Sequence, residues 1–90
     1  MLLRSEVIWF GSEMEKVLTF HDSQKGVVGW KDEDPDWLFN RLKDEVYELK
    51  QALEKINYSS VASKEEFMPI LKECVDVANF AMFIADRLRQ

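Results

Sequence analysis

Apolar and polar residues follow one another along this chain at intervals of three and four, the spacing of amphipathic helices. The first such stretch predicts a helix over about residues 2–20, with apolar positions at Leu3, Val7, Phe10, Met14, Val17 and Leu18. Residues 21–36 break the spacing with glycines, a run of charged side chains and a proline. We therefore expect a loop between this first helix and the next.

A second helix is predicted from the region of Pro35 to about Asn57. Asp34 or Asp36 beside the proline is a typical start signal, because a short acidic side chain caps the first free N–H groups. The apolar positions of this helix are Leu38, Leu42, Leu49, Leu53 and Ile56.

A third helix is predicted over about residues 64–88. Ser63 followed by Glu66 has the form of a capping box, and Pro69 fits only near the first turn or at a kink. Three helices without a strand pattern predict an all-α fold, in which residues 37–90 form an antiparallel hairpin or part of a bundle.

Length and composition narrow the interpretation. Ninety residues suit a single domain, and 47% hydrophobic residues is rich for a small monomer, so we expect apolar surface shared with another copy. A net charge of -5 argues against a nucleic acid polymer as partner. One cysteine, no signal segment and no apolar run long enough for a bilayer predict a cytoplasmic protein that does not enter a membrane.

Two glutamates on the second helix stand out against this background. Glu45 falls inside the apolar face, between Leu42 and Leu49, where an unpaired carboxylate is costly to bury. Glu48 follows one turn later at the edge of that face and can aim at the same point.

The third helix repeats the pattern. Glu73 lies at the border of the apolar face that contains Val77, Phe80 and Ile84, and Asp76 follows one turn later. If the two helices pack face to face, the four carboxylates converge, and their repulsion must be relieved by shared protons or a bound cation. An all-oxygen ligand set favours Mg²⁺, or Mn²⁺, over zinc.

A second hypothesis needs no metal. Arg41 is spaced to pair with Glu45, and Lys72 with Asp76, which would leave ordinary ion pairs on a non-catalytic helical interaction module. It explains Asp76, which lies near a polar stripe of the third helix, better than it explains a glutamate among leucines. That stripe consists of Lys72, Asn79 and Asp86.

The two acidic motifs resemble those of the MazG-like, all-α nucleoside triphosphate pyrophosphohydrolases, in which a Glu-x-x-Glu helix precedes a Glu-x-x-Asp helix. The resemblance covers about residues 37–86, although Cys74-Val75 replaces the small spacer common in the family. The segments that carry it are Trp37-Leu38, Arg41 to Leu49 and Glu73 to Phe80. It implies that Glu45, Glu48, Glu73 and Asp76 bind Mg²⁺, and that the active unit is a homodimer or a tetramer.

The resemblance also implies an activity. A metal-activated water attacks the α phosphorus of a nucleoside triphosphate and releases the monophosphate and pyrophosphate, with Glu48 as our candidate general base. Lys25, Arg41 or Lys72 would neutralise the leaving pyrophosphate, although Lys25 fits a solvated loop lysine equally well. Trp30 could stack on the base, and Asn79 is expected in the site. The base and the sugar stay open.

Overall fold

The computed structural model of the protein describes residues 2–25, 29–56 and 63–89, without the side chains of Gln24 and Lys25. Over these residues the chain is entirely helical and contains no strand, as the sequence predicts. The elements are α1 (Ser5–Lys25), the 3₁₀ helix η1 (Trp30–Asp32), α2 (Pro35–Glu54) and α3 (Lys64–Leu88). No helix among the described residues is both long and apolar enough to cross a membrane.

Helix α1 begins and ends later than the sequence predicts. It begins at Ser5, where the Arg4 carbonyl accepts from the N–H groups of Val7 and Ile8, both at 3.0 Å. It continues to Lys25, so residues 21–25, which we expected in the loop, are helical. The polar residues of this segment interrupt the apolar spacing but contain neither glycine nor proline, so nothing breaks the backbone before residue 26.

Side-chain caps begin the other two helices. The Asp34 carboxylate accepts from the Asp36 backbone N–H at 2.7 Å, so Asp34 is the N-cap and Pro35 the first helical residue. The predicted capping box of α3 is confirmed, because Ser63 and Glu66 each accept from the other's N–H at 3.2 Å.

The end of α2 and the position of Pro69 in α3 differ from the sequence interpretation. Helix α2 ends at Glu54 rather than near Asn57, which lies outside the described residues. Helix α3 continues through Pro69 beyond its first turn and ends at Leu88, as predicted.

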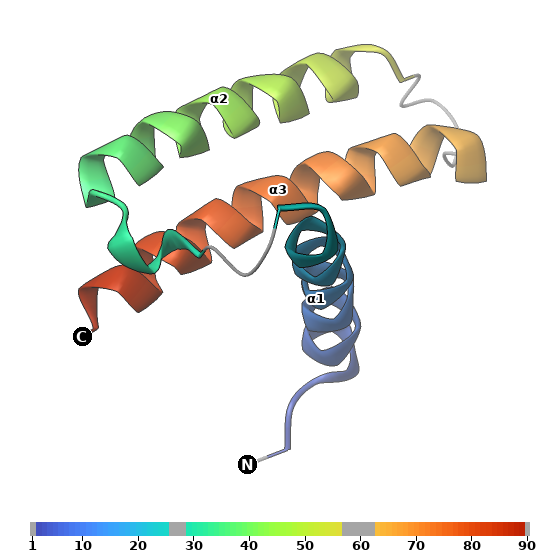
Figure 1. Cartoon of the computed structure of the whole chain (residues 1–90). Helices are drawn as coiled ribbons and strands as arrows, with labels where there is room; N and C mark the ends of the chain where they lie inside the picture. The colour runs from blue at the N-terminus through green and yellow to red at the C-terminus, as the bar shows by residue number, and fades with distance from the viewer. Residues whose placement is uncertain (1, 26–28, 57–62, 90) are drawn as a thin grey trace.

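Helices α2 and α3 lie side by side and antiparallel (Figure 1). The Arg41 guanidinium lies over the Phe80 ring, and the Asp76 carboxylate faces Glu45, so the middle of each helix meets the middle of the other. Their fully apolar core is small, and its buried members among the described residues are Leu38, Leu71 and Val75.

Helix α1 crosses α3 at a steep angle and leaves its N-terminal half away from the hairpin (Figure 1). Several large apolar side chains on this helix and the residues before it are exposed: Leu2, Leu3, Val7, Ile8, Trp9 and Phe20. A helix with so much apolar surface in water calls for a further partner.

Residues 30–33, just before α2, are fixed to the end of α3. The Trp30 indole N–H donates to Asp86 at 2.8 Å, Lys31 Nζ donates to the same carboxylate oxygen at 2.6 Å, and Arg87 Nε donates to the Glu33 carbonyl at 3.1 Å. These bonds hold η1 against the hairpin, between α3 and the start of α2.

Candidate metal centre and adjoining cavity

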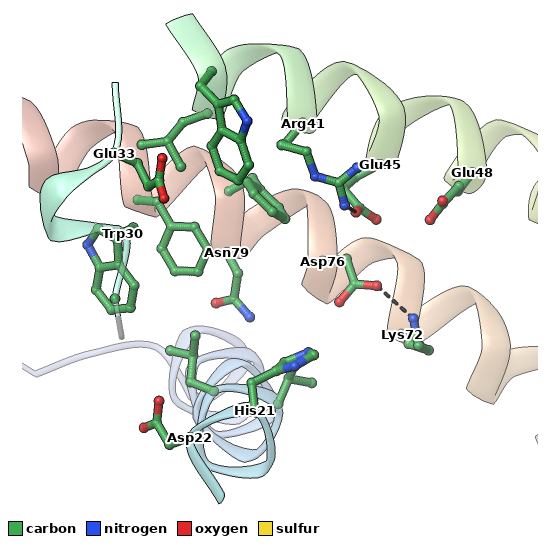
Figure 2. A pocket seen from close by; sticks show the side chains of 17 residues that line it. His21, Asp22, Trp30, Glu33, Arg41, Glu45, Glu48, Lys72, Asp76 and Asn79 are labelled. Carbon is green, nitrogen blue, oxygen red and sulfur yellow. Dashed lines mark hydrogen bonds and ion pairs between the residues drawn. The ribbon is translucent and has the colours of Figure 1, made fainter. Parts of the chain in front are cut away.

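A cavity of about 530 Å³ lies between the C-terminal half of α1, η1, and the facing sides of α2 and α3. Its walls differ from end to end. One end is aromatic, and along the hairpin it gives way to carboxylates and their basic partners (Figure 2). Its aromatic and charged lining residues include Trp30, Trp37, Phe80 and Phe83, then Arg41, Glu45, Glu48, Lys72 and Asp76.

The carboxylate end contains a cluster with the geometry of a cation site. Glu45, Glu73 and Asp76 each offer one oxygen, and these oxygens lie within 4.8 Å of one another. The three residues come from facing turns of α2 and α3, as the sequence predicts. Glu48 lies outside this converging set, exposed at the border of the cavity. Oxygen ligands at this spacing fit a hard divalent cation.

Glu45 is buried, with 6% of its surface exposed, which confirms that its position in the apolar face directs it inward. Burial raises the pKa of its carboxyl to about 7, and the neighbouring carboxylates of Glu48 and Asp76 add to that rise. Arg41 opposes it from 3.2 Å. The site therefore retains a proton on Glu45 near neutrality unless more positive charge arrives.

Glu73 is in a similar situation. Burial raises the pKa of its carboxyl, Lys72 lowers it, and Glu48 and Asp76 raise it further. Its Oε2 is buried and has no hydrogen-bond partner among the described residues. An unpartnered buried carboxylate oxygen beside other acids is unfavourable, and a cation would relieve it.

Both ion pairs of the metal-free hypothesis are present. Arg41 contacts Glu45 at 3.2 Å, and Lys72 contacts Asp76 at 2.8 Å, the contact drawn as a dashed line in Figure 2. They do not neutralise the cluster, because the pKa of Glu45 and of Glu73 remains raised beside them. The ion pairs and the candidate cation site therefore coexist.

The predicted substrate-binding residues divide into two groups. Arg41, Lys72 and Asn79 line the cavity beside the cluster, and Trp30 lines its aromatic end. The side chain of Lys25 lies outside the described part of the chain. Trp30 is already occupied by protein contacts, because its indole N–H bonds Asp86 and its ring stacks on Phe83 at 4.3 Å.

Asn79 is buried, with 3% of its surface exposed, although it belongs to the predicted polar stripe. Figure 2 places its amide between Trp30 and Asp76, extending toward α1. Neither its Oδ1 nor its Nδ2 has a hydrogen-bond partner among the described residues.

Sequence reasoning missed the role of Asp86, which anchors η1 to α3. Hydrogen bonds from Lys31 and then Trp30, together with Arg89, lower the pKa of this carboxyl well below its usual range. The sequence does contain a sign of buried polar residues here, since Asn79 and Asp86 lie seven positions apart on one face of an otherwise apolar helix. The same spacing is equally typical of a polar stripe exposed to solvent.

The carboxylates also border a second, smaller cavity of about 330 Å³ between the C-terminal half of α2 and the first turns of α3. Glu48 and Glu73 line it together with Lys55. Lys55 forms no ion pair among the described residues, so its ammonium is available to an anion.

No protein-family model, curated protein or solved structure matches this chain. The resemblance to MazG-like enzymes thus depends on the two acidic motifs and their surroundings alone.

Proposed function

We propose that the protein is a Mg²⁺-dependent nucleoside triphosphate pyrophosphohydrolase of the MazG-like type. The observation that carries the proposal is the convergence of three carboxylate oxygens, from Glu45, Glu73 and Asp76, in the wall of a cavity whose other end is aromatic. A nucleotide has the same two-part character, with anionic phosphates at one end and a flat ring at the other.

The four carboxylates have two different roles in the proposed hydrolysis, cation binding and activation of the attacking water. A bound Mg²⁺ would supply positive charge to the phosphate oxygens and lower the pKa of the attacking water. Glu45, Glu73 and Asp76 would hold the cation. Glu48, exposed beside them and outside the converging set, orients the water and accepts its proton while the oxygen bonds to the α phosphorus.

The leaving pyrophosphate needs positive charge as its bridging bond breaks. Arg41 and Lys72 each contact a cluster acid, and a cation that took over those contacts would leave both side chains free to bind the pyrophosphate. Lys55, across the second cavity, already lacks an acidic partner among the described residues, which makes it a further candidate.

The direct test measures pyrophosphate released from a panel of canonical and modified nucleoside triphosphates, with Mg²⁺ and with a chelator. We expect Mg²⁺-dependent release that Asp76→Asn abolishes while circular dichroism stays helical. Asp44→Asn is the matched control, because Asp44 is an exposed acid of α2 that pairs with the other side of Arg41. Full activity in Asp76→Asn would contradict the proposal.

We also infer that a second copy of the chain packs against the exposed surface of α1. The chain exposes 7021 Å², whereas a compact monomer of 10.6 kDa exposes about 5500 Å². The difference exceeds the roughly 800 Å² that each partner contributes to a standard interface. Sedimentation should therefore give a dimer or tetramer, and Ile8→Glu should shift it toward monomer; a monomeric wild type would overturn the inference.

The same exposed helix favours a non-catalytic interaction module as the second candidate. A titration with Mg²⁺ distinguishes the two candidate functions. A rise in melting temperature with Mg²⁺ that requires the cluster residues supports the enzyme, whereas no rise and no turnover of any nucleotide supports the module.

A further inference from the structure

Asn79 occupies a position where the packing of α3 calls for an apolar residue. Leu71 and Val75 precede it at intervals of four on the same face, and both are buried core residues. A carboxamide buried there without partners costs free energy, since it loses its hydrogen bonds to water and gains none from the protein. Its presence therefore calls for a hydrogen-bonding partner from the cavity.

The surroundings of the amide restrict what that ligand can be. Phosphate oxygens are unsuited, because they accept hydrogen bonds only and would leave Oδ1 unpaired. On the other side Phe80 and Phe83 make the cavity apolar. This part of the cavity suits an uncharged, flat group that both donates and accepts.

One aromatic side chain of the lining remains open to such a group. Trp37, at the start of α2, lines the cavity, is 48% exposed, and makes no ring contact or hydrogen bond within the described part of the chain. The ring of Trp30, by contrast, is stacked on Phe83. A planar ligand can therefore stack on the Trp37 indole near the aromatic end.

We propose that Asn79 reads the edge of the substrate's nucleobase, with its Nδ2 donating to a ring acceptor and its Oδ1 accepting from an adjacent ring or exocyclic N–H. Such donor–acceptor pairs occur on base edges, and asparagine matches them with both ends of its amide. A sugar hydroxyl also donates and accepts, but through a single oxygen, whereas the two ends of the amide match two neighbouring atoms of a ring edge. The inference rests on the proposed function for the identity of the ligand as a nucleotide.

The test uses free nucleosides, which carry no phosphate and need no metal. The side-chain NH₂ protons of Asn79, assigned by their loss in Asn79→Leu, are followed by nuclear magnetic resonance in a chelator. Adenosine, guanosine, cytidine, uridine and thymidine are added in turn. We expect at least one nucleoside to shift these protons and inorganic tripolyphosphate with Mg²⁺ to leave them unmoved. No shift with any nucleoside overturns the proposal.

A second measurement separates ligand recognition from a structural role. Asn79→Leu should hold or raise the melting temperature of the free protein, because it removes an unpaired polar group, and should weaken nucleoside binding about 10- to 100-fold. Asn40→Leu, the same change at an exposed site of α2, should leave binding unchanged. A lower melting temperature with unchanged binding would make the amide structural. Nucleoside binding without Mg²⁺-dependent hydrolysis would contradict the proposed function and leave this inference standing.

Discussion

Two carboxylate sites on the same hairpin differ in the groups that surround the negative charge. Asp86 is buried near the end of α3 and accepts hydrogen bonds from Trp30, Lys31 and Arg89. Glu45 and Glu73 are held in the middle of the hairpin beside other acids, and a buried oxygen of Glu73 has no partner among the described residues. The pKa of Asp86 is lowered, whereas the pKa of both glutamates is raised.

The difference separates an acid that stabilises the fold as an anion from the acids that we propose as cation ligands. A carboxylate surrounded by donors stabilises the fold as an anion, and a carboxylate surrounded by carboxylates opposes folding until a proton or cation joins it. The sequence alone does not make this distinction, because Asp86 belongs to the polar stripe of α3 that Asp76 also borders.

The largest expected effect comes from neutralising one acid at each site. Glu73→Gln should lower turnover of the best nucleotide at least about 100-fold, since it removes a ligand of the cluster. Its melting temperature in chelator should not fall, because the change removes a carboxyl whose pKa is raised by burial and by the neighbouring acids. Circular dichroism melts and pyrophosphate release measure the two properties.

Asp86→Asn should behave in the opposite way. It leaves the donors of Lys31 and Arg89 without an anion, so the melting temperature should fall by about 5 °C. Well below that temperature, kcat should stay within about threefold of wild type. If Asp86→Asn lost activity and kept its stability, the division between the two sites would be wrong.

The next effect is the pH dependence of stability without metal. The folded pKa of Glu45, about 7, lies above its ordinary value of 4.5, so its favourable contribution is complete below pH 4.5 and is lost as the pH rises through 7. The free energy of unfolding in chelator should therefore decrease between about pH 5 and pH 8, by on the order of 3 kcal/mol. Urea unfolding at each pH measures it.

Glu45→Gln provides the control for this dependence, since it should flatten the profile. Saturating Mg²⁺ should oppose the decrease in wild type, because cation binding strengthens as the carboxyls lose their protons. A profile in chelator that rises toward pH 8 would contradict the raised pKa.

The smallest expected effects on melting temperature come from removing the two lysines that form ion pairs at these sites. Lys31→Met and Lys72→Met should each lower the melting temperature in chelator by only about 2 °C, because both ammonium groups are partly exposed. Saturating Mg²⁺ should reverse the loss in Lys72→Met, where the cation replaces the missing charge beside Asp76, and leave the loss in Lys31→Met unchanged. If Mg²⁺ changed the melting temperatures of both variants equally, the proposed difference between the two carboxylate sites would be wrong.

Much of the fold follows from local rules that the sequence displays. The capping box at Ser63 and the acid before Pro35 begin their helices within a residue or two of the predicted positions. The C-terminal ends of the helices were harder to predict. Helix α1 continues through a polar segment that has lost the apolar spacing, because that segment contains no glycine or proline to end the helix.

Residues of the candidate site could be predicted only where a charged side chain interrupts an apolar helix face. Glu45 conflicts with the leucines around it, and its burial followed from that. Asp86 is consistent with an exposed stripe, so its bonds to Trp30 and Lys31 could not be inferred, because contacts between distant segments leave no periodic signal. The exposure of Glu48, whose carboxylate borders the converging set without joining it, depends on packing that one helix does not reveal.

The placement of the tryptophans gives the protein its own optical reporter. Of the three, Trp30 and Trp37 line the cavity from different elements, and Trp9 is on the projecting half of α1. Trp9→Phe would therefore leave a chain whose tryptophan fluorescence arises only at the cavity. In that variant, quenching of the emission would follow occupancy of the cavity without any label.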